Sequence, residues 1–290
     1  MQLVIFEKGF NYSQDGVGNR LVYYLQGCNM NCPWCANPEG IPISPPILVD
    51  GKYLLDSVCP HGAIKNQALD RRICIACDRR ECLNLYKNKG IGCKGKAIEV
   101  DAIVQEACEC VPMFFDNGGV TLTGGEPTLQ FDAVSDLFVK LRAAGIHTAM
   151  ETNGTCPDLP ALFPLIDQLM MDFKHYDSAV LRAVTGVGNE TTMDNLRKAA
   201  VAHKAVNIRI PLIHGFNTSE DNLFGTAAFL QTLDTECFSV EFLRYHEYGK
   251  GKWNQCGLPY SMDGNACVDS ETLDRFQTTF RASGFCVINT

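Results

Sequence analysis

Three cysteines on one short loop constrain this chain more than any other feature of its sequence. Cys28, Cys32 and Cys35 follow directly after an apolar run at 21–25 that predicts a β-strand. Three thiolates on such a loop can hold three irons of a cubane iron–sulfur cluster, in which cysteines normally bind all four irons. The fourth iron would then be open to a ligand, as in catalytic metal sites that keep a free position. A ligand that carries an amine beside a carboxylate would chelate this iron well.

Two other interpretations of these cysteines remain open, namely a zinc loop or three unrelated buried thiols. Cys-x2-Cys pairs do bind zinc, but a structural zinc ion takes four ligands, usually from paired knuckles. The chain has 15 Cys in total and begins without the basic, apolar pattern of a signal peptide. Clustered cysteines without such a signal indicate metal ligands in a reducing compartment. Because a cluster with an open iron is oxygen-labile, we expect the cytoplasm of an anaerobic or facultative organism.

Charge and hydrophobicity exclude two classes of partner. The net charge is -8 and no long run of Lys and Arg occurs, so we do not expect nucleic-acid binding. No apolar run approaches the roughly 20 residues that a membrane-spanning helix needs. The 290 residues are 46% hydrophobic, which is enough for a large core.

Predicted strands and helices alternate along most of the chain. Strands are expected at 3–6, 21–25, 119–123, 146–151, 168–174, 205–212, 238–245 and 285–289, and helices at 102–111, 130–144, 193–203, 221–233 and 271–282. Counted from 21–25, six strand–helix units predict an α/β fold with a partial (β/α)6 barrel. Each polar motif lies where a strand ends, which is the catalytic face of barrel folds. We therefore expect the cysteine loop and these motifs to meet on one face.

A second group of cysteines interrupts this pattern. After prolines at 42, 45 and 46, the composition changes over 47–100, which contains Cys59, Cys74, Cys77, Cys82 and Cys93. The spacing resembles parts of the two halves of a bacterial ferredoxin. We therefore predict a barrel core at 1–46 and 101–290 with a small ferredoxin-like, Cys-rich insertion at 47–100.

One auxiliary 4Fe–4S cluster is expected in this insertion. In two-cluster ferredoxins the last cysteine of each run binds the other cluster. By that rule Cys74, Cys77 and Cys82 take Cys59 as their fourth ligand, and Cys93 is the alternative to Cys59. A zinc knuckle is a further alternative.

The cysteine loop, with Trp34 in a Cys-x3-Cys-x-aromatic-Cys pattern, resembles the hallmark of the radical S-adenosylmethionine (radical SAM) superfamily. Residues 11–20 resemble the Asp-Gly-Pro-Gly-x-Arg segment of glycyl radical enzyme activating enzymes, with Val17 in place of Pro. Residues 243–253 resemble their Leu-Pro-Tyr-His-x-x-Gly-x-x-Lys-Trp segment, with Arg244 in place of Pro. The sequences at 124–126 and 172–174 are similar to the family's Gly-Gly-Glu and Asp-Leu-Lys motifs.

This resemblance implies a set of cofactor contacts. The open iron would be chelated by the amino and carboxylate groups of S-adenosylmethionine, and the segment at 11–20 would lie near a protein substrate. The residues expected at the cofactor are Trp34, Cys35, Ala36, Gly125, Glu126, Asp172, Phe173, Lys174, Arg209 and His246. The Gly125 carbonyl would accept a hydrogen bond from the methionyl ammonium, and Glu151 with Asp172 would hold a monovalent cation.

Two of these expectations also follow from the residues themselves. Asp172 and Lys174 are two positions apart and so share one face of a strand, where opposed charges can bracket a zwitterionic ligand. Arg209 is a charge inside an apolar strand and therefore needs a partner. For Arg209, a structural salt bridge and a cofactor contact are both open.

The implied activity is that of a radical SAM oxidoreductase which activates a partner glycyl radical enzyme. Reductive cleavage of S-adenosylmethionine would give methionine and a radical that abstracts hydrogen from a backbone glycine of the partner, so no side chain need act as acid or base. Flavodoxin or ferredoxin would supply the electron, and the auxiliary cluster would relay it or hold the insertion folded. The alternatives are a radical SAM enzyme for a small molecule and a non-catalytic iron–sulfur or zinc protein. Activases of different glycyl radical enzymes share these motifs, so the sequence does not name the partner.

Overall fold

The computed structural model describes residues 1–12, 14–52, 59–85, 90–202, 204–233 and 235–289. His203, the expected last residue of the helix at 193–203, lies outside these ranges. So do residues 53–58 and 86–89 of the expected insertion.

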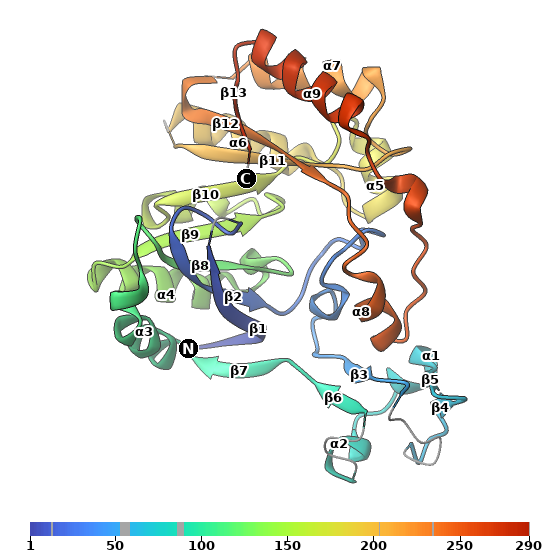
Figure 1. The fold of residues 1–290 in the computed structure, drawn as a ribbon. Coiled ribbons are helices and arrows are strands. Elements are labelled where there is room, and N and C mark those ends of the chain that lie inside the picture. The colour runs from blue at the N-terminus through green and yellow to red at the C-terminus, as the bar shows by residue number, and fades with distance from the viewer. Residues whose placement is uncertain (13, 53–58, 86–89, 203, 234, 290) are drawn as a thin grey trace.

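One curved sheet of nine strands organises the molecule (Figure 1). Its strand order is β13-β12-β11-β10-β9-β8-β2-β1-β7. The strands are β1 (Gln2–Tyr12), β2 (Asn19–Leu25), β7 (Lys96–Glu99), β8 (Gly119–Gly124), β9 (His147–Thr152), β10 (Gln168–Asp172), β11 (Val206–Leu212), β12 (Phe238–Arg244) and β13 (Cys286–Ile288). Every pairing from β2 to β13 is parallel, whereas β1 is antiparallel to both β2 and β7.

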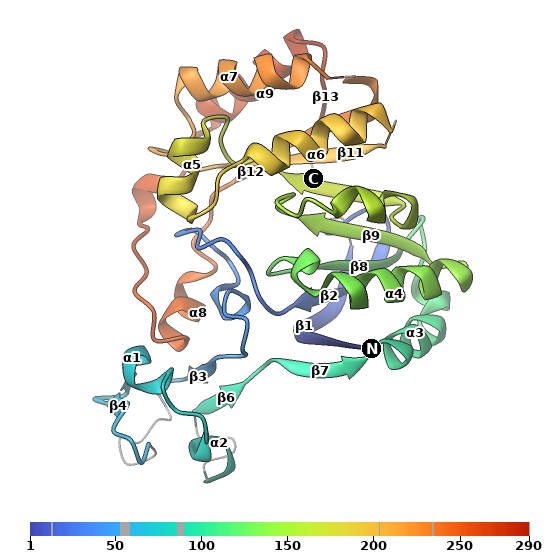
Figure 2. The ribbon, with the colours of Figure 1, turned by 180° about the vertical axis from the view of Figure 1, so that it is seen from behind.

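Helices connect the parallel strands. They are α3 (Val100–Glu109), α4 (Phe131–Ala143), α5 (Ser178–Thr185), α6 (Glu190–Val201), α7 (Glu220–Gln231), α8 (Lys250–Gln255) and α9 (Ser270–Ala282). Short 3-10 turns lie at Pro38–Gly40, Val111–Met113, Pro127–Gln130, Leu159–Leu165, Thr235–Cys237 and Gly264–Ala266. Figure 2 shows α4 and α6 in front of the sheet, on the face opposite the β1–β2 hairpin of Figure 1. In the described part of the chain, no helix has both the length and the apolar character needed to cross a bilayer.

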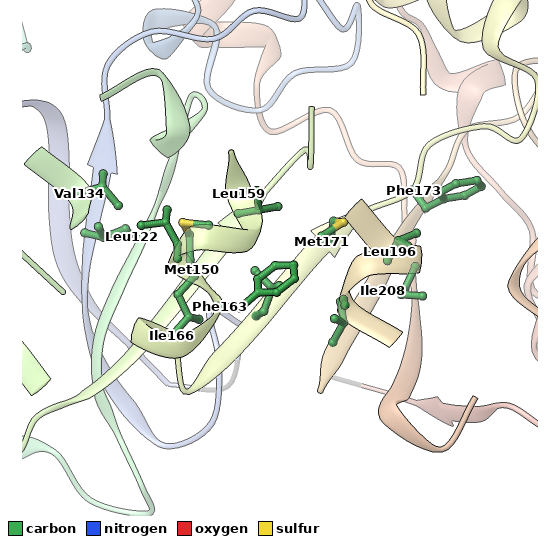
Figure 3. Packing of buried hydrophobic residues seen from close by; sticks show 14 of the residues in the cluster. Leu122, Val134, Met150, Leu159, Phe163, Ile166, Met171, Phe173, Leu196 and Ile208 are labelled. Atoms are coloured by element: carbon green, nitrogen blue, oxygen red, sulfur yellow. The ribbon is translucent and has the colours of Figure 1, made fainter. Parts of the chain in front are cut away.

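The main core fills the space between the sheet and these helices (Figure 3). Leu122, Met150, Met171 and Ile208 come from four neighbouring strands and are all fully buried. The helices cover them with apolar side chains that include Val134, Leu159, Phe163, Ile166 and Leu196. Burial of side chains of this size stabilises the fold by about 1.5–3 kcal/mol each. The sheet is thereby held as a rigid frame for the loops at the carboxyl ends of its strands.

The expected α/β fold with six parallel strand–helix units is confirmed, and the five expected strands from 119 to 245 match β8–β12 to within two residues. The expected opening strand at 3–6 was too short, because β1 continues to Tyr12 by pairing with β2 in a hairpin. The polar residues Glu7 and Lys8 hid this extension in the sequence, since their strand is stabilised by hydrogen bonds to a partner strand. The helices α5 and α8 were not predicted.

The insertion forms a small body of its own. Strand β3 (Ile47–Val49) pairs with β6 (Ile91–Cys93), and β4 (Ile64–Lys65) pairs with β5 (Ala68–Leu69). The short helix α1 (Arg71–Cys74) contains Cys74, and the short helix α2 (Glu81–Leu85) contains Cys82. Cys77 lies between the two helices. Six buried side chains form its core: Ile47, Val49, Ala63, Ile64, Leu69 and Ile91. The chain returns to the main sheet at β7, a few residues before the boundary expected at residue 100.

Candidate active site

A cavity of about 920 Å³ lies inside the partial barrel and receives side chains from the whole length of the chain. Cys28, Cys32 and Cys35 line it from the loop after β2. The strands that follow contribute one polar group after another: Gly125 after β8, Glu151 on β9, Asp172 and Lys174 at the end of β10, Arg209 on β11 and His246 after β12. Trp34 and Ala36 also line it. The structure thus gathers residues that are more than 200 positions apart in the sequence.

Backbone hydrogen bonds hold the cysteine loop in place. The Gly27 and Cys28 N–H groups donate to the carbonyls of Gly40 and Ile41 over 2.8 and 2.9 Å. Two further N–H groups donate to sulfur, from Met30 to Cys28 Sγ and from Asn37 to Cys35 Sγ, each over 3.4 Å. Such donors stabilise a thiolate or a cluster-bound sulfur.

Burial opposes the charged form of these thiols. It raises the pKa of Cys28 and of Cys35 to about 12, although the N–H donor to each sulfur acts in the opposite direction. A positively charged metal centre would replace the protons, as metal binding to cysteine requires. The donor set therefore suits an iron–sulfur cluster. Among the described residues, these three are the cysteines that line the cavity, and no three His, Cys, Asp or Glu side chains converge as ligands of a single metal ion.

Arg209 is the centre of a buried ion-pair network. Its Nη1 lies 3.0 Å from Glu151 Oε1, and its Nε lies 3.0 Å from Glu241 Oε2. Its Nη2 donates to the Gln14 carbonyl. Burial alone would raise the pKa of Glu151, but Arg209 and the Thr123 hydroxyl hold it below its ordinary value. The salt bridge expected for Arg209 is therefore present, in a side chain that also lines the cavity.

Asp172 and Lys174 form an ion pair on the same wall. Burial lowers the pKa of Lys174, but the Asp172 carboxylate more than offsets this effect and raises the pKa above its ordinary value. The Cys32 and Cys28 sulfurs act in the same direction as Asp172. Lys174 is thus a permanent cation beside the cysteine loop, where a carboxylate of a ligand can bind.

Two residues expected at the cofactor do not line the cavity. Glu126 is only 1% exposed, and its carboxylate accepts hydrogen bonds from Thr128 N, Thr152 Oγ1 and Asn153 N, so it ties the loop after β8 to the loop after β9. Phe173 is also 1% exposed and stacks on Phe229 with ring centroids 5.5 Å apart. Both side chains support the walls of the cavity from behind.

Gly125 lies at a close approach between two loops. A Cβ atom at this position would be 2.0 Å from the Gly27 carbonyl oxygen, so no other residue fits without moving the cysteine loop. The Gly-Gly-Glu motif therefore has a structural reason in this chain: its glycine lets the backbone after β8 contact the backbone before Cys28.

The segment at 14–18 carries one acidic side chain to the cavity. Thr121 Oγ1 donates to the Asp15 carbonyl over 2.7 Å, and Val17 N donates to Gln168 Oε1 over 2.9 Å. The fully buried Arg20 donates to the Val17 carbonyl over 3.1 Å. Gln168 is the first residue of its strand, so the segment lies across the amino ends of the strands and presents Asp15 from there.

Gln14, Asp15 and Tyr248 line the cavity from the segments at 11–20 and 243–253 that the sequence analysis singled out. Several other lining residues were missed: Tyr24, Glu241, Leu273, Gln277 and Asn289. Glu241 offered the same signal as Arg209, a charge inside an apolar strand, and the two are in fact partners. The other positions carry no such signal, because they reach the cavity only through the curvature of the sheet.

Comparison with known proteins identifies the family of this chain. The family model of the radical SAM superfamily matches residues 22–226. The 4-hydroxyphenylacetate decarboxylase activating enzyme of Clostridioides difficile (strain CD196) is 31% identical over 287 residues, which cover 93% of this chain and 90% of the relative. The choline trimethylamine-lyase activating enzyme of Oleidesulfovibrio alaskensis is 31% identical over 289 residues, which cover 94% of this chain and 93% of the relative.

Solved structures show the same architecture. A domain of a pyruvate-formate lyase-activating enzyme from Bacteroides vulgatus superimposes with a TM-score of 0.50 at 27% identity, covering 60% of this chain and 99% of that domain. Streptococcus suis SuiB shares the fold alone, with a TM-score of 0.55 at 14% identity over 93% of this chain and 48% of SuiB. The chain therefore belongs to the radical SAM superfamily and, within it, to the activating enzymes of glycyl radical enzymes.

Proposed function

We propose that this chain activates a partner glycyl radical enzyme from the cavity that Cys28, Cys32 and Cys35 line. When bound, the reduced cluster and S-adenosylmethionine supply the radical that takes hydrogen from a backbone glycine of the partner. One observation carries the proposal: three cysteines from one loop line the same cavity as the half-buried, opposed charges of Asp172 and Lys174. This arrangement suits a ligand with an amine and a carboxylate that must lie beside a metal centre.

The cavity walls suggest a role for each residue. The three cysteines hold the cluster, the Gly125 carbonyl accepts from the methionyl ammonium, and Lys174 attracts the methionyl carboxylate. Arg209 holds the two acidic side chains with which it pairs, Glu151 and Glu241, in the cavity wall. The other cofactor contacts come from Trp34, Ala36, Asp172 and His246, all of which line the cavity. For Glu126 and Phe173 we propose an indirect role, since their side chains hold neighbouring loops and helices.

A monovalent cation between Glu151 and Asp172 is not part of the proposal. Glu151 already pairs with Arg209, and Asp172 already pairs with Lys174. A further cation is therefore not needed to neutralise either carboxylate.

We propose an auxiliary 4Fe–4S cluster in the insertion, held by Cys59, Cys74, Cys77 and Cys82. Three of these side chains pack against the small core of the insertion. The pKa of Cys74 is raised by burial and by the proximity of the other three thiols, which indicates that the four lie together. Cys93 faces different groups: its Sγ lies 3.8 Å from both Arg80 Nη1 and the Pro45 carbonyl. This favours Cys59 as the fourth ligand.

Iron content distinguishes the two candidates for the fourth ligand. In anaerobically reconstituted protein, Cys59→Ala should lose about half of the bound iron, because the auxiliary cluster loses one of the four thiolates that normally hold such a cluster. Cys93→Ala should retain all of it. Loss of iron in Cys93→Ala with full retention in Cys59→Ala would show that Cys93 is the fourth ligand instead. Zinc in place of iron would exclude the cluster.

We further propose that flavodoxin or ferredoxin supplies the electron, that the auxiliary cluster relays it, and that the protein works in the cytoplasm of an anaerobic or facultative organism. The relay is supported by contacts of α8 with both parts, since Trp253 binds the Cys35 carbonyl and α8 also lies against β3 of the insertion (Figure 1). A reducing compartment is supported by the 15 cysteines of the sequence, eight of which belong to the two groups proposed to bind clusters.

Co-expression with candidate glycyl radical enzymes tests the function. The partners of the relatives, such as 4-hydroxyphenylacetate decarboxylase and choline trimethylamine-lyase, are the first candidates. Electron paramagnetic resonance (EPR) should show a glycyl doublet with the correct partner only when S-adenosylmethionine is added. Deoxyadenosine formation that is stimulated by a small molecule and by no glycyl radical enzyme would favour the small-molecule alternative. No deoxyadenosine at all would favour a non-catalytic protein.

A further inference from the structure

The short helix α8 contacts the cysteine loop through three residues whose role the proposed function leaves open. Trp253 Nε1 donates to the Cys35 carbonyl over 2.9 Å. Lys252 Nζ donates to Asn37 Oδ1 over 2.7 Å and lies 3.0 Å from Glu39 Oε1. These contacts join positions more than 200 residues apart in the sequence.

Gly249 brings the helix close enough for these contacts. A Cβ atom at this position would be 2.6 Å from the Cys35 carbonyl oxygen, so a side chain would push α8 away from the loop. Residues 249, 252 and 253 are spaced i, i+3 and i+4 and therefore share one face of a helix. The Gly-x-x-Lys-Trp spacing thus has a physical explanation: all three residues face Cys35 and the residues after it.

The charge at Lys252 is required by a buried carboxylate. Glu39 is 2% exposed, and one of its oxygens, Oε2, has no hydrogen-bond partner among the residues that the structure describes. The other oxygen pairs with Lys252. A buried carboxylate that loses its cation is strongly destabilised, so Lys252 keeps the end of the cysteine loop in its buried position.

The contacts of α8 converge on one sulfur. The Asn37 N–H donates to Cys35 Sγ, while the Asn37 side chain is held by Lys252 and the Cys35 carbonyl is held by Trp253. Cys28 is held differently, through its N–H to the Ile41 carbonyl. Weakening the Trp253 contact should therefore affect Cys35 more than Cys28. Lys252 also acts through Glu39 on its neighbours Gly40 and Ile41, whose carbonyls hold the N–H groups of Gly27 and Cys28.

We propose that Gly249, Lys252 and Trp253 form a clamp, the α8 clamp, which positions Cys35 and directs the Asn37 N–H at its sulfur. The clamp residues are positioning residues, since they act through the cysteine loop. The inference rests on the proposed function only in that the loop binds the cluster. Its first test needs neither cluster nor substrate.

Thiol reactivity in the cluster-free protein measures how well the loop is held. The variants are Trp253→Phe, which keeps an aromatic ring but loses the N–H donor, and Lys252→Met, which keeps the length but loses the charge. The matched control is Lys250→Met on the same helix, where the exposed lysine pairs with Glu247 at 3.4 Å. Alkylation by iodoacetamide, followed by peptide mass spectrometry, gives separate rates for Cys28 and Cys35.

We expect Cys35 to react about three- to tenfold faster in Trp253→Phe and Lys252→Met, because losing one hydrogen bond or ion pair shifts local opening by about that factor. Cys28 should change by less than about twofold in Trp253→Phe, and Lys250→Met should match the wild type at both cysteines. An unchanged Cys35 rate in both variants would overturn the clamp. So would equal acceleration of Cys28 and Cys35 in Trp253→Phe, which would mean that the whole protein had loosened.

The reduction potential of the cluster gives a second readout. Hydrogen bonds to cluster sulfurs stabilise the reduced state, so losing the direction of the Asn37 N–H should make the potential more negative. An EPR-monitored titration should follow the signal that responds to S-adenosylmethionine. A lower potential in Trp253→Phe and Lys252→Met than in Lys250→Met supports the clamp, and identical potentials in all three contradict it. If the partner activity failed while Cys35 reactivity changed as expected, the proposed function would fail and the clamp would stand.

Discussion

Replacing Cys32 by alanine should abolish cleavage of S-adenosylmethionine, lowering the rate by at least about three orders of magnitude, which corresponds to about 4 kcal/mol of activation free energy. The two remaining thiolates cannot hold a cubane with a single open iron. The measurement is deoxyadenosine formed under anaerobic conditions with dithionite, together with iron content. Cys32 is the most buried of the three cysteines and no other cysteine of the described chain lines the cavity, so no nearby thiol can replace it.

Two control variants separate this effect from general damage. Cys286→Ala changes an exposed thiol outside the cavity and should leave cleavage and iron content at the wild-type level. Cys82→Ala should retain part of the cleavage with dithionite, because a chemical reductant bypasses the proposed relay. Total loss in both Cys82→Ala and Cys32→Ala would contradict a secondary role for the insertion, and normal cleavage in Cys32→Ala would contradict the site itself.

The free energy of unfolding of Arg209→Met should be about 3–5 kcal/mol lower than that of the wild type. The substitution removes the cation from the 1%-exposed Glu241 and from the partly exposed Glu151, and removing one partner of a buried ion pair costs about this much. Urea unfolding under anaerobic conditions measures the difference. Arg281→Met, at an exposed position on α9, is the matched control and should stay within about 0.5 kcal/mol of the wild type.

The loss of unfolding free energy in Arg209→Met should be largest at high pH and smaller at low pH. In the wild type, Arg209 holds the pKa of Glu151 below its ordinary value, so this stabilisation is present at neutral pH and is lost as the pH falls through the folded-state pKa. In Arg209→Met the Glu151 carboxylate has lost its cation and can be protonated, which relieves part of the penalty. The difference between the two proteins should therefore shrink between pH 8 and pH 5. The double variant Arg209→Met with Glu241→Gln should recover part of the lost unfolding free energy. A loss in Arg209→Met that is below about 1 kcal/mol and independent of pH would contradict the ion-pair network of Arg209.

The sequence was informative where one local pattern determines the structure. Apolar runs that end at turn residues predicted the parallel strands, and the position of each polar motif after a strand predicted that the motifs would meet. The hairpin of β1 was not predictable, because Glu7 and Lys8 are held in a strand by a partner strand and by ion pairs to Lys94 and Glu106. Pairing between distant segments leaves no periodicity in either of them.

The site shows the same limit at the level of single residues. The sequence pointed to Glu126 because of its motif, but its carboxylate binds the loop after β9, which only the folded sheet brings near. It pointed to Trp253 through a resemblance, but the hydrogen bond to the Cys35 carbonyl spans more than 200 positions. Sequence patterns thus identified which residues matter, and the structure was needed to say what each one contacts.

The central claim is that Cys28, Cys32 and Cys35 hold a cluster with one iron free for S-adenosylmethionine. EPR of the reduced, anaerobically reconstituted protein tests this most directly, with spectra recorded before and after the cofactor is added. The account predicts that one cluster signal changes shape and position on addition of S-adenosylmethionine, while the signal of the proposed auxiliary cluster stays the same. A spectrum that does not respond to the cofactor, or zinc bound at the three cysteines, would contradict it.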